Sequence, residues 1–369
     1  MMMFESAAAA ARTIKFPGLP SNHGERVHRF SDENLPDLQK ILRASNSEDA
    51  YCRSYLYYAL TGRGTVWAIE HEDVWIICAR HPNISRNLLI FFPFAKDAAQ
   101  LEAQIRTLSH HPTFLSQFSR VLLARIAETT CNELFFGKKE IVLPGTRLRR
   151  VSEKVLDWVF PSYDVSLEKL AAGAGSDLAC FRNKIRQFDA RNVDVIALQE
   201  MKSSEIENAI RDISRAWLRN RLARKRGSSG RGHDDLIGPY DWLAKLNSPD
   251  LRCKRPDIDG IFLRRGSEYI AFSLWEEVPS CHDTVPSIAA LPGSCERGLP
   301  EFLRFQMVKK LAARGYKTMC IGGSETAGLD HFKRKLAPIA KHRLYTIRLL
   351  LRHHRCGSGD DLRRLAVAA

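Results

Sequence analysis

Hydrophobic residues recur along the first half of the chain with two different periods. A period of three to four residues predicts amphipathic helices over 34–43, 98–108 and 112–128, and the aromatic run 51–59 is interpreted as another helix. Short apolar runs predict strands over 88–94, 140–143 and 155–160, and a strand pair over 66–70 and 74–79 around an acidic turn. Strands interleaved with helices indicate a mixed α/β layer structure.

The second half of the chain repeats this rhythm. The same criteria predict helices over 176–190, 204–225 and 300–313, strands over 193–197 and 318–321, and a hairpin over 259–263 and 269–275. Residues 344–351 alternate as an edge strand does, although a helix also fits them. The two halves look like two copies of one α/β plan. We expect a flexible segment over 1–25, domains over 26–165 and 166–355, and a loose tail over 356–369.

The composition is that of an ordinary globular protein with a strongly basic balance. The 369 residues are 44% apolar and 27% charged, and the net charge is +14. This excess favours an anionic partner, either nucleic acid, anionic lipid or a phosphorylated substrate, over a merely basic surface. No apolar run approaches the roughly 18–20 residues that a membrane span needs. We expect a cytoplasmic protein, with peripheral contact with an anionic membrane as the alternative.

The nine cysteines are scattered, and no two of them have CxxC spacing. This pattern favours buried thiols in a reducing compartment over a zinc site or a disulfide framework. We therefore expect neither a metal nor a structural disulfide.

A glycine-containing loop, Gly173-Ala-Gly175-Ser-Asp177, precedes the helix predicted over 176–190. Such a loop presents backbone N–H groups to an anion at a helix start. Basic residues one turn apart follow on one face of the helix. The candidates for phosphate binding are Arg182, Asn183, Lys184 and Arg186. A helix with a solvated basic face is the alternative.

Seven Lys or Arg residues and no acidic residue lie in the stretch 215–231. Basic residues clustered on a helix and its following loop are typical of nucleic-acid or anionic-lipid binding, with a solvated helix end as the alternative. The loop Arg226-Gly-Ser-Ser-Gly-Arg-Gly232 is similar to the coenzyme A pyrophosphate loop of N-acetyltransferases, Arg/Gln-x-x-Gly-x-Gly/Ala, but is one residue too long. The candidates for nucleic-acid binding are Arg215, Arg219, Arg224, Lys225 and Arg226.

The strand predicted over 318–321 runs into Gly322-Gly323, and Glu325 follows at the strand end. Strand ends followed by glycine are where α/β proteins place ligand-binding groups. Glu325 is the first catalytic candidate, with Lys333 and Lys335 on a short helix after it; an ion pair among the three is the alternative. His282 and Asp283, after the strand 269–275, are second candidates, with a surface turn as the alternative.

Two blocks of this sequence resemble the phosphatidylglycerol lysyltransferase catalytic-domain family. The stretch 177–188, Asp-Leu-Ala-Cys-Phe-Arg-Asn-Lys-Ile-Arg-Gln-Phe, resembles that family's helix K-x-R-N-x-I-x-x-F, with Cys180 in place of the leading lysine. The stretch 322–338 resembles its C-terminal strand–turn–helix block, with Gly-Gly-Ser-Glu-Thr where the lipid enzymes tend to have an Asn-x-Glu-x-Asp-like run. The resemblance covers roughly residues 30–350 in organisation.

The resemblance implies two tandem GNAT-like domains that move an aminoacyl group from charged tRNA to a hydroxyl or amine of a small metabolite or lipid. It implies no cofactor besides the aminoacyl-tRNA donor and no stable protein partner. Alternatives are a GNAT enzyme with an acyl-coenzyme A donor and a non-catalytic basic module that binds RNA or membrane.

An aminoacyl ester is already activated, so transfer needs only a proton acceptor and an oxyanion donor. Glu325 is expected to be the base, with Asp283 and His282 as second candidates, and Lys333 or Lys335 to hold the oxyanion or the terminal phosphate. The basic helix at 182–186 would hold the tRNA acceptor end, and the cluster at 215–231 would follow its backbone.

Overall fold

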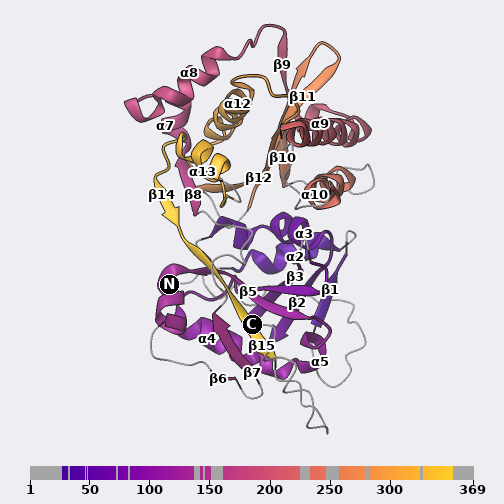
Figure 1. The fold of residues 1–369 in the computed structure, drawn as a ribbon, viewed down its shortest axis with the longest axis vertical. Helices are drawn as coiled ribbons and strands as arrows, with labels where there is room; N and C mark the ends of the chain where they lie inside the picture. The colour runs from indigo at the N-terminus through magenta and orange to yellow at the C-terminus, as the bar shows by residue number, and fades with distance from the viewer. Residues whose placement is uncertain are drawn as a thin grey trace, which may run out of the picture.

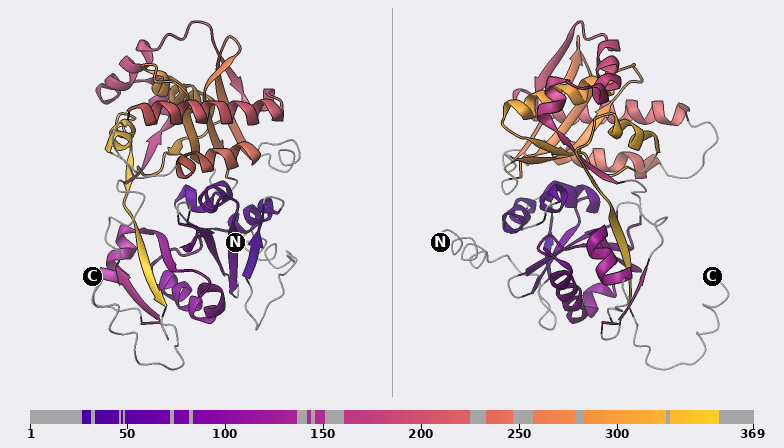
Figure 2. Two further views of the ribbon diagram at one scale, coloured as in Figure 1. Left: turned by 45° about the vertical axis from the view of Figure 1, so that its right-hand side comes forward. Right: turned by 90° about the vertical axis from the view of Figure 1, so that its left-hand side faces the viewer.

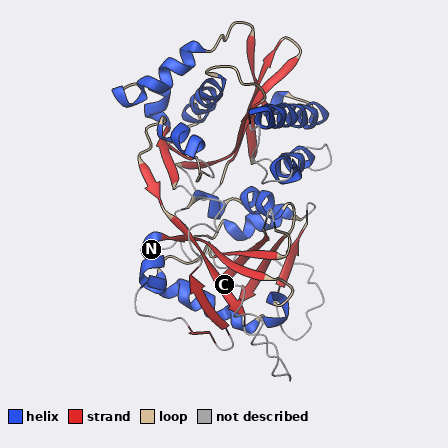
Figure 3. Ribbon diagram, in the orientation of Figure 1, coloured by secondary structure: helices blue, strands red, loops and turns tan. Residues whose placement is uncertain are grey.

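The chain folds around two mixed sheets, each with helices packed on it (Figure 1; Figure 3). A computed structural model describes residues 27–31, 34–45, 47, 49–71, 74–81, 84–136, 142–143, 146–150, 161–224, 233–246, 257–278, 283–324 and 327–351. The predicted α/β class with two separate sheets is confirmed.

The first sheet has eight strands in the order β1-β2-β3-β4-β5-β15-β7-β6. They are β1 (Val27–Phe30), β2 (Val66–His71), β3 (Val74–Arg80), β4 (Asn87–Phe91), β5 (Arg120–Ala127), β6 (Val142–Leu143), β7 (Thr146–Arg150) and β15 (Leu344–Leu351). β4 and β5 are parallel, and parallel strands need a crossover connection. This crossover contains α4 (Ala98–Thr107) and α5 (Pro112–Leu115), whereas α2 (Leu35–Leu42) and α3 (Tyr55–Gly62) connect β1 to β2, and α6 (Glu128–Cys131) follows β5.

The second sheet has seven strands in the order β14-β8-β13-β12-β11-β10-β9. They are β8 (Ser162–Ser166), β9 (Val193–Ala197), β10 (Ile258–Arg265), β11 (Glu268–Glu276), β12 (Thr284–Pro292), β13 (Thr318–Cys320) and β14 (Ala340–His342). Its parallel pair is β12 and β13, joined through α12 (Leu299–Ala313). The remaining helices are α7 (Leu167–Ala172), α8 (Ala179–Gln187), α9 (Ser203–Arg224), α10 (His233–Leu246) and α13 (Ala327–Arg334).

The last strand of the chain belongs to the first sheet. β15 pairs with β5 and β7, so residues 344–351 form an interior strand and not the edge strand or helix that the sequence allowed. Figure 1 and Figure 2 show β15 in yellow, running from the second unit into the sheet of the first. β8 pairs with β13 and β14, so the expected boundary at 165 and 166 falls at the end of a strand of the second sheet.

The hydrophobic core is continuous between the two units. One cluster joins Tyr55 and Leu56 of α3 to Ile210 of α9, Trp242 of α10 and Phe272 of β11. α9 and α10 cover the face of the second sheet that carries this cluster, whereas α7, α8 and α12 pack on its other face. The two units are therefore packed together through buried apolar side chains.

One predicted helix is wrong. Residues 112–128 contain only the short helix α5, and 120–127 form β5, which lies inside the sheet between β4 and β15. A strand with both faces covered has a nearly continuous apolar run, and periodicity alone does not distinguish such a run from a helix.

Some other elements differ in their bounds from the prediction, were not predicted, or were predicted outside the described residues. The aromatic run forms a 3-10 helix, η2 (Ala50–Arg53), followed by α3, and the helix predicted over 176–190 is a 3-10 turn followed by α8. α7, α10, β8 and β12 were not predicted. The strand expected over 155–160 lies outside the described residues.

Candidate functional site at the junction of the two sheets

The parallel strand β12 pairs with β13 only along its first three residues. Thr284–Pro286 pairs with Thr318–Cys320, and the ladder ends there. A tyrosine of the first unit enters at this point: the Tyr51 hydroxyl donates to the Ser287 carbonyl at 2.7 Å and lies 3.3 Å from the Cys320 carbonyl. Gly322 has φ +65°, and a Cβ there would lie 3.0 Å from the Tyr51 hydroxyl. We call this meeting point of the two units the junction.

Tyr51 is held in place by charged neighbours from its own unit. Its backbone N–H donates to the Asp49 side chain at 3.0 Å, which fixes the start of η2. The same carboxylate accepts from Arg125 Nε at 2.6 Å. The Arg125 guanidinium lies 5.1 Å from the ring centroids of Tyr51 and Tyr57, as in cation–π contacts. Burial raises the pKa of Tyr51 well above its ordinary value, so its hydroxyl remains a donor.

A second arginine reaches the junction from α12. Arg304 Nη1 donates to the Ser287 hydroxyl at 2.7 Å and lies 3.4 Å from the Met307 sulfur. No salt bridge to it is found in the part of the chain that the structure describes, and its Nε lacks an acceptor there. Burial lowers the pKa of Arg304 to about 10.

The glycine block that the sequence singled out follows β13 at the junction. Lys333 on α13 donates through Nζ to the Gly322 carbonyl at 3.0 Å and also to the Gly323 carbonyl. Ser324 is fully buried. The structure thus brings the 322–324 segment and Lys333 together, whereas Glu325 lies outside the described residues. Lys335 follows α13 and is half-buried.

α13 is anchored to β8 beside this block. Asp330 accepts from the Tyr163 hydroxyl at 2.8 Å and pairs with Arg334 at 2.6 Å. On the same sheet His342 lies 2.7 Å from Asp164, and its pKa is raised by this partner. Burial raises the pKa of the Cys320 thiol, which therefore stays protonated and is not a nucleophile at neutral pH.

Asp283, one of the second catalytic candidates, lies directly before β12. Asp283 is exposed and pairs with Lys317 at 3.1 Å, and its carbonyl accepts from the N–H groups of Lys317 and Thr318. It is therefore at the start of the paired stretch, whereas Tyr51 is at its end. His282 lies outside the described residues.

The basic helix predicted at 182–186 is α8. Arg182 Nη1 donates to the carbonyls of Gly173 and Gly175 at 2.7 and 2.6 Å, and the Gly173 N–H bonds within α7. The Gly173 N–H is thus hydrogen-bonded within the chain. It does not point outward to an anion, contrary to the expectation for this loop. Asn183 and Arg186 are exposed, and Lys184 is half-buried.

The basic cluster predicted at 215–231 begins on α9. Arg215 and Arg219 are exposed one helical turn apart, and Arg221 lies 5.1 Å from the ring centroid of Trp217. Arg224 is the last residue of α9. Lys225, Arg226 and the loop compared with the coenzyme A motif lie outside the described residues.

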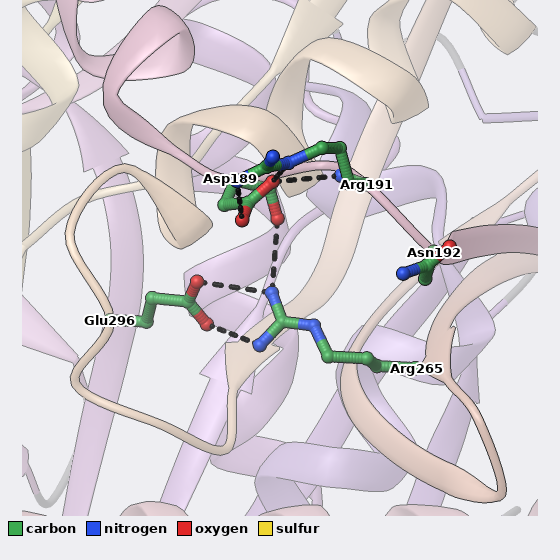
Figure 4. A pocket seen from close by; sticks show the side chains of 5 residues that line it. All are labelled: Asp189, Arg191, Asn192, Arg265 and Glu296. Carbon is green, nitrogen blue, oxygen red and sulfur yellow. Dashed lines mark hydrogen bonds and ion pairs between the residues drawn. The ribbon is translucent and has the colours of Figure 1, made fainter.

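A separate cleft of about 410 Å³ lies beside the tip of the β10–β11 hairpin (Figure 4). Its charged groups are paired with one another: both Nη atoms of Arg265 lie 3.0 Å from the Glu296 carboxylate, and Arg191 pairs with Asp189. Asn192 completes the lining. Since none of the predicted site residues lines this cleft, the junction is the better candidate.

The sequence did not identify Tyr51, Asp49, Arg125 or Arg304. One signal was available for Arg304, a charged residue within the apolar stretch Phe302–Phe305. No group of three or more His, Cys, Asp or Glu side chains suited to a metal is found among the described residues. None of the described helices has the length and apolar character that crossing a bilayer requires.

Solved structures of several proteins are similar to this chain, and three of them illustrate the likeness. A conserved protein of unknown function from Bacteroides thetaiotaomicron VPI-5482 has a TM-score of 0.62 and 12% identity, over 88% of this chain and 99% of that chain. L-PGS from Bacillus licheniformis has a TM-score of 0.51 and 14% identity, over 93% and 96% of the two chains. A tandem GNAT protein from the clavulanic acid biosynthesis pathway has a TM-score of 0.50 and 7% identity, over 91% and 100%.

No family model matches the chain, and no curated protein matches its sequence. At these identities the similarity establishes the fold. The protein has the tandem GNAT fold, as the resemblance to the phosphatidylglycerol lysyltransferases implied.

Proposed function

We propose that the protein is an acyltransferase that moves an aminoacyl group from charged tRNA to a hydroxyl or amine of a small metabolite or lipid. The observation that carries this proposal is the convergence at the junction: β13 ends in the Gly322–Ser324 block where β12 and β13 separate, directly before Glu325. The fold shared with L-PGS along nearly the whole of both chains supports it.

The proposed chemistry uses few groups. Glu325 takes the proton of the acceptor as it attacks the aminoacyl ester, and Lys335 or Lys333 stabilises the oxyanion or the terminal phosphate. The ester bond to the tRNA ribose then breaks, and the ribose oxygen leaves as a hydroxyl with the proton that Glu325 returns. Lys333 additionally fixes the two glycine carbonyls of the strand end. Asp283 and His282 remain the second candidates for the base, and no metal or further cofactor takes part in the proposal.

The same proposal assigns the basic residues to the donor. Arg182, Asn183, Lys184 and Arg186 would hold the acceptor end of the tRNA. Arg215 and Arg219, with Arg224, Lys225 and Arg226 beyond them, would follow its backbone. The net charge of +14 supports an anionic donor.

The direct test measures transfer of a labelled amino acid from charged tRNA to a product, with and without RNase. Glu325→Gln keeps the size of the side chain and removes the proton acceptor, so the single-turnover rate should fall about 10²–10⁴-fold with an unchanged melting temperature. Glu268→Gln, at the exposed start of β11, is the matched control and should transfer normally. A normal rate with a lowered melting temperature would make Glu325 a structural residue and move the search to His282 and Asp283.

RNA binding by α9 has its own test. Each phosphate contact contributes about 0.7–0.9 to the slope of log K against log salt, so Arg215→Ala with Arg219→Ala should flatten the slope by about 1.5. Arg86→Ala with Arg120→Ala removes the same charge from exposed positions at the end of the first sheet remote from the second, and should leave the slope unchanged. Equal slopes for the α9 variant and the unmodified protein would make this face a solvated surface.

An acyl-coenzyme A donor is the second candidate, because the fold is shared with a tandem GNAT protein whose structure is described as being without AcCoA. RNase-resistant consumption of acetyl-coenzyme A would favour this candidate. RNA binding without any transfer would favour a non-catalytic module.

A further inference from the structure

Arg304 carries a positive charge into the junction, and none of the described residues pairs with it as an acid. Its residue is 8% exposed, and the described part of the chain places no carboxylate in a salt bridge with it. Removing a cation from water is costly, and proteins normally offset the cost with a paired acid. An arginine kept in this position therefore destabilises the isolated protein relative to an apolar side chain of similar length.

The contacts that Arg304 does make are weak for a guanidinium. Nη1 bonds to the neutral Ser287 hydroxyl at 2.7 Å, with the sulfurs of Met307 and Met319 at 3.4 and 4.0 Å. Nε is buried without an acceptor among the described residues. A planar guanidinium with donors to spare matches a carboxylate or a phosphate, which accept from two N–H groups at once.

A second buried donor without a described partner follows β13. Ser324, which ends the glycine block after β13, is 0% exposed, and its hydroxyl has no partner among the described side chains and backbone. Ser287, which contacts Arg304, is the first residue of β12 beyond the paired stretch. The Ser287 hydroxyl and the Arg304 guanidinium thus meet at the point where the pairing of β12 with β13 ends.

We propose that an oxyanion, the carboxylate or phosphate of a ligand, binds beside Arg304 where the pairing of β12 with β13 ends, and that Arg304 neutralises its charge. This inference goes beyond the proposed transfer, because its test needs neither a donor nor turnover. A structural role makes the opposite prediction for stability, since a cation that the fold needs cannot be lost without cost.

The experiment follows the melting temperature of the full chain at constant ionic strength while chloride is replaced by inorganic phosphate or by acetate. Arg304→Met removes the charge and keeps an unbranched side chain, and Lys309→Met removes one charge from an exposed position on the same helix as the matched control. In the unmodified protein and in the control, the oxyanion should raise the melting temperature. In Arg304→Met the apparent Kd for the oxyanion should be at least tenfold higher. Without the anion, this variant should melt no lower than the unmodified protein.

The two anions distinguish the source of the ligand group. A response to phosphate alone supports a phosphorylated ligand, and a response to both anions supports a carboxylate ligand. An unchanged response in Arg304→Met would overturn the proposal, as would an anion-free melting temperature clearly below that of the unmodified protein. Neither result depends on whether aminoacyl transfer is detected, so failure of this site and failure of the proposed function are separable.

Discussion

Each unit of the protein has a parallel strand pair with a buried arginine beside it. The two arginines differ in whether a described carboxylate neutralises them. Arg125, on β5, is paired with Asp49 and lies against the rings of Tyr51 and Tyr57. Arg304, packed beside β12, has a serine hydroxyl and methionine sulfurs around it. Arg125 thus has an acid supplied by the chain, whereas Arg304 has none among the described residues, and this difference is the basis of the proposed anion site.

The backbone reinforces this difference. Arg125 has φ +60°, a conformation that is uncommon for a residue with a Cβ. Such backbone strain persists only where the surrounding contacts over-determine it, and here Asp49 and the two rings do so. Arg304 lies in the regular helix α12 and has no comparable constraint. The first arginine is therefore expected to be essential for stability and the second dispensable for it.

The largest effect on stability is expected from Arg125→Met. This change leaves the Asp49 carboxylate largely buried without its cation, which should lower the free energy of unfolding by about 3 kcal/mol. Chemical denaturation measures the loss. Adding Asp49→Asn should restore part of it, because the unpaired charge is then removed. Equal stabilities for Arg125→Met and Arg304→Met would break the comparison between the two arginines.

A third buried ionisable side chain, Glu276 at the end of β11, should have an intermediate effect on stability when it is replaced. It is fully buried and accepts from the Ser54 hydroxyl and from the N–H groups of Tyr55 and Leu56, so it joins the second sheet to the start of α3. Glu276→Gln replaces part of this acceptor set, and we expect it to cost about 2 kcal/mol at pH 5.

The pH dependence of this variant tests the charge itself. Burial raises the pKa of Glu276 from 4.5 to about 8, so the folded state binds its proton more tightly than the unfolded state. The stability that this group contributes is complete below pH 4.5 and is lost as the pH rises to about 8. The advantage of the unmodified protein over Glu276→Gln should therefore shrink between pH 5 and pH 8. A difference that stays constant in urea denaturation over this range would contradict the shift.

The smallest effect is expected from Tyr51→Phe, which removes the hydroxyl between the two units and keeps the ring. Losing one hydrogen bond to a buried carbonyl should cost about 1 kcal/mol. Tyr58→Phe is the matched control, because its hydroxyl donates to the Cys52 carbonyl within the first unit at 2.8 Å. Unchanged stability for Tyr51→Phe in the same denaturation assay would show that the tyrosine is only a packing residue.

Elements governed by local patterns were predictable from the sequence. β2 and β3 pair as expected around the turn between them, and α9 and α12 match their predicted ranges closely. The Gly322–Gly323 strand end was also predictable from the sequence, and it lies at the junction of the two units. Their signals reside in residues adjacent in the chain or one turn apart, which periodicity detects.

The interior strand β5 shows where local patterns stop being sufficient. Its apolar residues face α-helical layers on both sides, and only its pairing with β4 and β15 distinguishes it from a helix. The same limit applies to Arg125, whose partner Asp49 is 76 positions away in the sequence. A basic residue in an apolar stretch is visible in the sequence, but the presence or absence of its acid is not.

The sequence by itself determined that the protein is basic, has a mixed α/β fold in two copies, and carries a glycine block after a strand of its second half. The tertiary structure alone decided that β15 completes the first sheet, that Tyr51 meets Ser287 from 236 positions away, and that Arg304 is buried without an acid among the described residues. The physical reason is that composition and periodicity are sums over neighbouring residues. Strand pairing and the cost of an unpaired charge depend instead on which distant segments exclude water from the same place.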